Sequence, residues 1–119
     1  MKILLADDEP FVREIVVKLL RRAGHTVETA IDGQCALDAF QGGTFDIVMT
    51  DLGMPGLDGL ALARLIKIRA PAQVVVLLTG AGDDGAVPAN VDFVLSKPIG
   101  LEALTNALGR LAGLTLIGG

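Results

Sequence analysis

The chain has almost no aromatic residues: its 119 residues include four phenylalanines and neither tryptophan nor tyrosine. Proteins that bind single-stranded nucleic acid stack bases on aromatic rings, and proteins that bind a phosphate backbone carry an excess of Lys and Arg. Here 10 Lys and Arg stand against 14 Asp and Glu, which gives a net charge of −4. We therefore expect no direct contact with nucleic acid.

Cysteine, histidine and long apolar runs are also scarce. The single cysteine, Cys35, cannot form an internal disulfide, and we expect it to pack on a helix face. Without a Cys/His cluster no zinc site is available, and the lone His25 is expected at the surface. No apolar run is long enough for a signal peptide or for the roughly 20 residues that span a bilayer. The expected protein is cytoplasmic and does not enter the membrane.

The chain is rich in aliphatic residues, and 51% of it is hydrophobic. Short apolar runs alternate with longer segments of helical periodicity, a pattern typical of βαβ units in a parallel sheet. Five strands are predicted. Four are almost continuously apolar, as buried parallel strands are: Ile3–Ala6, Ile47–Thr50, Val74–Leu78 and Phe93–Leu95. The fifth, Thr26–Ala30, alternates between polar and apolar residues, as an edge strand does. We predict an α/β fold with a doubly wound, five-stranded parallel sheet and five helices.

The helices differ in how clearly the sequence marks them. The clearest ends at Gly24 and carries one apolar stripe, made of Val12, Ile15, Val16, Leu19, Leu20 and Ala23. Others are predicted around Ala36 to Phe40, from about Asp58 to Arg69, and along the leucines that begin at Leu101. The fourth helix should fall between Thr79 and Phe93, where three glycines and a proline predict a short, irregular or mobile helix.

Polar side chains follow the predicted strands at their carboxyl ends. Asp7 and Asp8 come after the first strand, Asp51 after the third, Thr79 after the fourth and Lys97 after the fifth. In a doubly wound sheet these ends line one crevice, so we expect the five side chains to converge. Carboxylates that converge repel one another, and a set of oxygen ligands selects a hard cation such as Mg²⁺. A carboxylate in such a site can attack phosphorus to form an aspartyl phosphate, while a metal, a lysine and a hydroxyl stabilise the group in transfer.

Each of these residues also has a purely structural explanation. Asp7 and Asp8 are candidates to cap the helix that follows, Asp51 to form a turn, Thr79 to be a strand-end hydroxyl and Lys97 to be solvated. This explanation does not predict that all five stand at strand ends. Two other acidic features are expected to be structural or solvated: Asp58 at the start of the third helix, and the pair Asp83 and Asp84 in a loop.

Four segments, in this order, carry a resemblance to a known family: ILLADDEP at 3–10, IVMTDLGMPGLDG at 47–59, VVVLLTG at 74–80 and VLSKP at 94–98. The chain resembles the receiver domain of two-component response regulators over nearly its whole length. The resemblance implies the strand order 2-1-3-4-5. It also implies a receiver domain over residues 1–113, followed by a C-terminal tail or truncated linker at 114–119.

The resemblance further implies which residues hold the metal. Asp51 matches the phosphoacceptor, Asp8 a direct ligand of Mg²⁺ and Asp7 a ligand that acts mostly through water. Asp51 itself and the backbone carbonyl of Gly53 complete the protein ligands, and Mn²⁺ is expected to substitute for Mg²⁺.

It also implies which residues meet the phosphoryl group. Thr79 matches the switch hydroxyl that moves toward the new group, and Lys97 matches the cation that pairs with it. The peptide bond between Lys97 and Pro98 is cis in this family. Small residues such as Gly80 stand beside the switch hydroxyl and leave room for phosphate.

The sequence departs from the family at one residue and in one segment, since the stretch from Thr79 to Lys97 is shorter and richer in glycine than is usual in receivers. Many receivers carry an aromatic switch residue where this chain has Val94, and the neighbouring Phe93 should point to the opposite face of its strand. Gly53 and Ala81 stand where the family tunes phosphoryl lifetime, and neither side chain can hold or exclude an attacking water. We expect dephosphorylation to be governed by open access to the site or by a partner phosphatase.

The predicted function is a phosphorylation-activated signalling switch. A histidine kinase or a phosphotransfer protein donates a phosphoryl group to Asp51 in a Mg²⁺-dependent reaction, and the altered surface changes affinity for a downstream protein that the sequence does not name. The chain catalyses only its own phosphotransfer and autodephosphorylation and is not an enzyme acting on other substrates. The main alternative is a receiver-like module that binds proteins without phosphorylation.

Two other classes are disfavoured by single positions. A flavodoxin-like carrier places a Ser/Thr/Gly loop after its first strand, where this chain has Asp7, Asp8 and Glu9. A metal-dependent phosphatase usually needs a second Asp two residues after its nucleophile, and this chain has Gly53 there.

Overall fold

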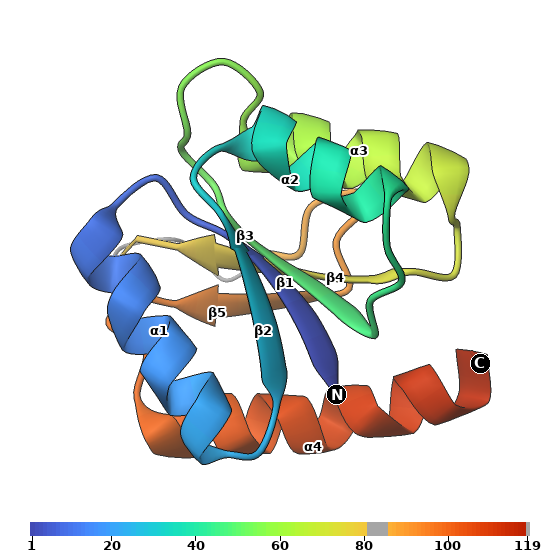
Figure 1. Cartoon of the computed structure of the whole chain (residues 1–119). Coiled ribbons are helices and arrows are strands. Elements are labelled where there is room, and N and C mark those ends of the chain that lie inside the picture. The colour runs from blue at the N-terminus through green and yellow to red at the C-terminus, as the bar shows by residue number, and fades with distance from the viewer. Residues whose placement is uncertain (81–85, 119) are drawn as a thin grey trace.

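Five parallel strands form a single sheet in the order β2-β1-β3-β4-β5 (Figure 1). The computed structural model describes the backbone of residues 1–80 and 86–118 and the side chains of these residues up to residue 112. The strands are β1 (Lys2–Ala6), β2 (Thr26–Ala30), β3 (Ile47–Asp51), β4 (Val74–Thr79) and β5 (Phe93–Ser96). The α/β class, the parallel sheet and its order are thus confirmed, and the alternating segment does form an edge strand.

Among the described residues, four helices cover the two faces of this sheet: α1 (Pro10–Arg22), α2 (Gly33–Gln41), α3 (Gly59–Arg69) and α4 (Leu101–Gly118). Helices α1 and α4 lie on one face, and α2 and α3 lie on the other (Figure 1). Successive residues of a strand point to opposite faces, so β1 contributes Ile3 and Leu5 to the core under α1 and α4, and Leu4 and Ala6 to the core under α2 and α3. All four side chains are fully buried.

Helix α1 follows its predicted stripe with one correction. Val16 and Leu20 are buried as predicted, and Gly24 adopts φ +93° just after the helix, as a C-terminal glycine does. Ile15 is 54% exposed, whereas Val17, which lies outside the predicted stripe, is buried. The helix contacts the sheet along the line from Val16 to Leu20, so the buried side of α1 is centred away from Ile15.

The prediction that Cys35 packs on a helix face was wrong. Cys35 is exposed in the first turn of α2, where its backbone N–H donates to Oδ1 of Asp32 at 2.8 Å. The buried side of α2 is formed by the next two residues, Ala36 and Leu37. Asp58 caps α3 as predicted, since its Oδ1 accepts a hydrogen bond of 2.8 Å from the N–H of Ala61.

The segment between β4 and β5 contains no helix in its described part, residues 86–92. Residues 81–85, which include Asp83 and Asp84, lie outside the described residues. Helix α4 is therefore the counterpart of the last predicted helix, and its buried residues include Leu104, Leu108 and Leu111.

Asp92, just before β5, ties this strand to β4 and α3. Its N–H donates to the carbonyl oxygen of Val75 at 2.8 Å. Its Oδ2 accepts from the N–H of Val75 and from Nζ of Lys67, each at 2.8 Å. One side chain thus fixes the start of β5 against its neighbouring strand and against a helix.

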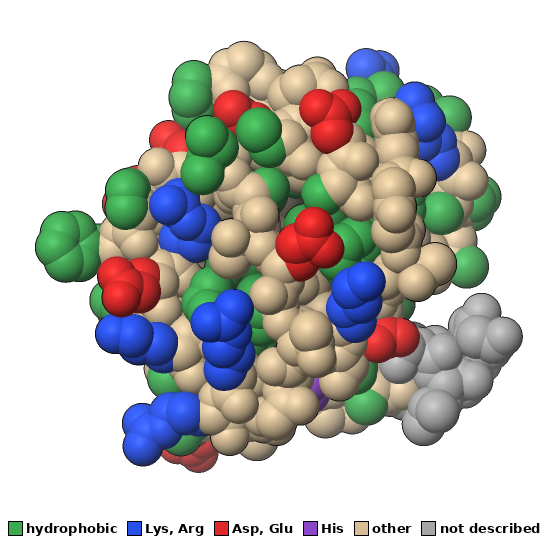
Figure 2. Space-filling view, in the orientation of Figure 1, with side chains coloured by type: hydrophobic (Ala, Val, Ile, Leu, Met, Phe, Trp, Pro, Cys, Tyr) green, Lys and Arg blue, Asp and Glu red, His purple; other side chains and the backbone are tan. Residues whose placement is uncertain are grey.

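The outer surface is mixed in character. Figure 2 shows basic side chains gathered over α1, which contributes Arg13, Lys18, Arg21 and Arg22. Within the described part of the chain, no helix combines the length and the apolar character needed to cross a membrane.

We expect Asp92→Ala to lower the free energy of unfolding by about 1–3 kcal/mol, because the backbone N–H of Val75 and the ammonium group of Lys67 lose their acceptor. Urea denaturation measures this change. Glu14→Ala is the matched control, since Glu14 pairs with Lys18 where both side chains are more than 60% exposed (65% and 72%), and such pairs contribute about 0–1 kcal/mol. Equal effects of the two substitutions would contradict the role assigned to Asp92.

Candidate functional site

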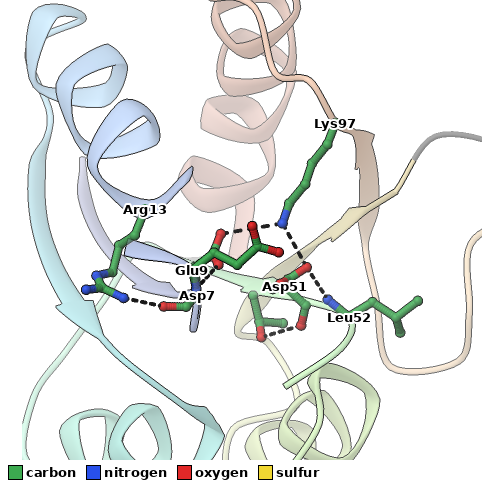
Figure 3. Close-up of polar contacts among 7 residues, drawn as sticks. Asp7, Glu9, Arg13, Asp51, Leu52 and Lys97 are labelled. Carbon is green, nitrogen blue, oxygen red and sulfur yellow. Dashed lines mark hydrogen bonds and ion pairs between the residues drawn. The ribbon is translucent and has the colours of Figure 1, made fainter. Parts of the chain in front are cut away.

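The carboxyl ends of β1, β3 and β5 bring three charged side chains together. In the sheet register Ala6 lies beside Thr50, and Asp51 lies beside Leu78. Asp7 follows Ala6 directly and Lys97 follows β5, so both stand at the same edge of the sheet as Asp51. Figure 3 shows these three side chains pointing toward one another.

Lys97 lies between the two carboxylates. Its Nζ is 3.1 Å from Oδ1 of Asp51 and 3.6 Å from Oδ2 of Asp7. The Lys97 side chain is 18% exposed and that of Asp7 is fully buried. The backbone N–H of Leu52 also donates to Oδ1 of Asp51, at 3.0 Å. The same oxygen of Asp51 therefore accepts a hydrogen bond from a backbone amide and forms an ion pair with an ammonium group.

Asp7, Asp8 and Asp51 form an acidic cluster. One carboxylate oxygen of each lies within 4.8 Å of those of the other two. Asp7 Oδ2 is buried and has no hydrogen-bond partner among the described residues. Buried polar atoms normally have partners, and three carboxylate oxygens at this spacing suit a hard divalent cation. The residues present therefore fit a bound Mg²⁺.

Burial dominates the electrostatics of Asp7. It raises the pKa of the Asp7 carboxyl, and the charge of Asp51 adds to the rise, while the Glu9 amide and Lys97 oppose it. For Lys97, burial lowers the pKa, but the hydrogen bond to Asp51 and the charges of Asp7 and Asp51 outweigh it, so the pKa is raised. Lys97 is therefore a fixed cation of the site.

The loop after β1 is held by contacts that the sequence did not predict. The guanidinium of Arg13 donates to the carbonyl oxygen of Asp7 at 2.7 Å, and the N–H of Glu9 donates to Oδ1 of Asp7 at 2.9 Å. Glu9 is the N-cap residue of α1 and makes no side-chain cap bond. Asp7 and Asp8 thus precede the N-cap position, which weakens the capping explanation. The contact of Arg13 could have been predicted from one feature of the sequence, a cationic residue one turn into the helix that follows an acidic loop.

Thr79 ends β4 and is 1% exposed. Its hydroxyl oxygen is buried without a hydrogen-bond partner among the residues that the structure describes. Its carbonyl oxygen accepts a bond of 2.7 Å from the N–H of Lys97, so the backbones of the two residues are joined. The peptide bond between Lys97 and Pro98 is cis, as predicted.

The structure shows the surroundings of Phe93, Val94 and Gly53, which the comparison with the family singles out. Phe93 packs against the core under α1 and α4, and Val94 against the core under α2 and α3, so the two point to opposite faces as predicted. Gly53 is exposed in the loop after β3, and a Cβ added to it would meet nothing within 4 Å. Ala81 lies outside the described residues.

The model of one protein family, the response regulator receiver domain, matches residues 3–109. The chain belongs to this family. Receiver domains are signalling modules of two-component systems, not classical enzymes. Membership excludes the flavodoxin-like and phosphatase alternatives.

Individual relatives support this receiver assignment. The gliding motility regulatory protein of Myxococcus xanthus is 36% identical over 118 residues, a match covering 93% of this chain and 15% of that protein. The response regulator receiver protein CpdR of Brucella abortus is 34% identical, over 92% of this chain and 95% of that protein. The response regulator TrrA of Thermotoga maritima, solved in complex with Mg²⁺ and BeF, has a TM-score of 0.84 and 31% identity, over 92% of this chain and 97% of that one. The receiver domain thus spans nearly all of some relatives and a small part of others.

We expect Asp7→Asn to stabilise the metal-free receiver and to weaken its affinity for Mg²⁺. Folding raises the pKa of Asp7, so at neutral pH the ionised carboxylate opposes folding, and its neutral replacement removes that cost. A higher melting temperature is expected in EDTA, together with a smaller shift in melting temperature when Mg²⁺ is added.

Thermal denaturation with EDTA and with Mg²⁺ measures both effects. Glu28→Gln, at an exposed position of β2, is the control and should change neither. Loss of stability of Asp7→Asn in EDTA would contradict the electrostatic account of the cluster.

Proposed function

We propose that this receiver domain is a phosphorylation-activated switch whose phosphoacceptor is Asp51. The observation that carries the proposal is the position of Lys97, whose Nζ contacts Asp51 and faces Asp7 within a cluster of three carboxylates. This set provides a nucleophile, a fixed cation and oxygen ligands for a metal in one place. The same combination suits transfer of a phosphoryl group to a carboxylate.

Asp7, Asp8, Asp51 and the carbonyl of Gly53 would hold Mg²⁺ or Mn²⁺. The bound ion would neutralise charge on the carboxylates and on the transferring phosphoryl group. Within the chain, Arg13 and the Glu9 amide orient Asp7 so that its Oδ2 remains available as a ligand. These contacts act before any donor arrives.

The donor is proposed to be a phosphohistidine of a histidine kinase or a phosphotransfer protein. Oδ1 of Asp51 is engaged by Leu52 and Lys97, so Oδ2 is the oxygen that attacks phosphorus. The new P–O bond forms as the P–N bond of the donor breaks, and the imidazole keeps the electron pair of that bond. Lys97 then pairs with the phosphoryl oxygens.

The hydroxyl of Thr79 is the proposed switch group. It is buried and unpartnered within the described chain, so a phosphoryl oxygen on Asp51 would offer it an acceptor that it otherwise lacks. Movement of Thr79 pulls on β4 and, through its carbonyl contact, on the backbone of Lys97. With Val94 in place of an aromatic ring, the change that reaches the surface is expected to differ from that of receivers with the ring.

An apolar surface beside the site suits contact with the donor protein. Phe11 on α1 is 84% exposed, and a cavity of about 390 Å³ lies between α1 and the loop after β5. The cavity is lined by apolar side chains and by Lys97: Val12, Ile15, Val16, Lys97, Pro98 and Ile99. Because Lys97 belongs to both the cavity and the site, a protein seated here would reach Asp51.

The decisive experiment is intact-mass analysis after incubation with acetyl phosphate. We expect the native chain to gain one phosphoryl group with Mg²⁺ and none with EDTA, and Asp51→Asn to gain none in either case. Asp58→Asn is the matched control, because Asp58 caps α3 outside the site, and it should be phosphorylated like the native chain. A native chain that gains no phosphate with Mg²⁺ would favour a protein-binding module that works without phosphorylation.

We also expect the lifetime of the phosphorylated form to depend on positions 53 and 81. Gly53→Asn places a polar side chain in open space beside Asp51, and Ala81→Glu adds one at the other tuning position. Both variants should change the rate at which the acyl phosphate decays, which the loss of phosphoryl mass over time measures. Unchanged lifetimes in both would contradict control by open access.

A further inference from the structure

Two glycines contact the chain that connects the acceptor strand to α3. Residues 52–58 form this connection, and they include Gly53, the proposed carbonyl ligand. Gly59 is the first residue of α3 and Gly33 the first residue of α2, and both are buried. The two approach the connection at different points, Gly59 at its start and Gly33 near its end.

Gly59 lies against the peptide group that joins Asp51 to Leu52. A Cβ on Gly59 would overlap the carbonyl oxygen of Asp51 and would lie 3.0 Å from its carbonyl carbon. The N–H of Gly59 donates to the carbonyl oxygen of Leu52 at 2.9 Å, which holds the helix start in this place. Backbone atoms cannot rotate away as a side-chain end can, so an added methyl group would have to displace the peptide or the helix.

The same peptide group reaches the carboxylate of Asp51. Its N–H, which belongs to Leu52, donates to Oδ1 of Asp51 at 3.0 Å. Its carbonyl oxygen accepts a bond of 3.0 Å from the hydroxyl of Thr50. A tilt of this peptide would therefore move the donor that orients the carboxylate.

Gly33 lies against the far end of the connection. A Cβ there would overlap the carbonyl oxygen of Leu57 and would lie 3.0 Å from both its carbonyl carbon and its Cβ. This contact involves α2, which has no residue in the acidic cluster. Gly33 therefore acts on the connection that carries Gly53 and not on Asp51 itself.

We propose that Gly59 is a positioning residue for phosphoryl transfer to Asp51, and that Gly33 is a positioning residue for the metal-binding loop. This inference rests on the proposed function, in which Asp51 is the acceptor and Gly53 a metal ligand. The two glycines have separable effects: Gly59 sets the direction of the carboxylate, and Gly33 sets the place of the loop carbonyl.

The test compares Gly59→Ala, Gly33→Ala and a matched control, Gly42→Ala. Gly42 is the C-cap residue of α2, and a Cβ there would meet its nearest neighbour at 3.9 Å, an ordinary contact. The Mg²⁺ dissociation constant is measured by calorimetry without a donor, and the rate of phosphorylation by acetyl phosphate is measured at saturating Mg²⁺. Circular dichroism tests whether each variant is folded.

Gly59→Ala should lower the saturated rate by about 10- to 100-fold, because misplacing a reacting group by a fraction of an ångström to an ångström has this effect. Gly33→Ala should raise the Mg²⁺ dissociation constant by about 10-fold or more and change the saturated rate less. Gly42→Ala should change neither quantity. A purely structural role would lower stability without this division between rate and metal affinity.

A folded Gly59→Ala with a native saturated rate, or a folded Gly33→Ala with native Mg²⁺ affinity, would overturn the corresponding assignment. If Gly59→Ala does not fold, Thr50→Val decides in its place, because it removes the other contact on the Asp51 carbonyl while keeping the side-chain volume nearly the same. A slowed saturated rate then supports the role of this peptide, and a native rate overturns it. Should Gly33→Ala not fold, Leu57→Gly decides in its place, because it loosens the connection at the residue that Gly33 contacts. A raised Mg²⁺ dissociation constant then supports the loop assignment, and a native value overturns it. A native chain that gains no phosphoryl group contradicts the proposed function instead, whereas the calorimetric comparison still tests Gly33.

Discussion

The repulsion among Asp7, Asp8 and Asp51 is the constraint around which this receiver is organised. Three carboxylates meet at the end of a sheet whose interior is mostly aliphatic, and Lys97 is a cation that contacts two of them. The cluster persists because strands buried on both faces hold its backbone in place. An unfavourable charge arrangement is thereby maintained by a favourable apolar core, and it provides affinity for a cation that relieves the repulsion.

The fold was largely predictable because its determinants are local in sequence. Continuous apolar runs indicated the central strands, and the alternating run from Thr26 to Ala30 indicated the edge. The errors concern rotation about a helix axis. Ile15 and Cys35 are apolar residues beside true core positions, and a periodicity of 3.6 residues cannot separate the centre of a buried face from its margin.

The site was predictable to the extent that strand ends converge. That rule brought Asp7, Asp51 and Lys97 together, and it required only the strand boundaries. The contact of Arg13 with the Asp7 carbonyl and the close approach of Gly59 to Asp51 depend on how helices pack on the sheet, to within a methyl group. Contacts of this accuracy depend on the packing of the whole structure, so no short sequence pattern predicts them.

The anchoring of β5 by Asp92 separates two parts of the molecule that evolution can treat differently. Because Lys67 and Val75 hold Asp92 at the start of the strand, the place of Lys97 at its other end does not require a helix in residues 86–92. The length and composition of residues 86–92 are then not tied to the position of Lys97. Receivers could in this way differ in the surface that residues 86–92 present to partners while the acidic cluster and Lys97 keep their places.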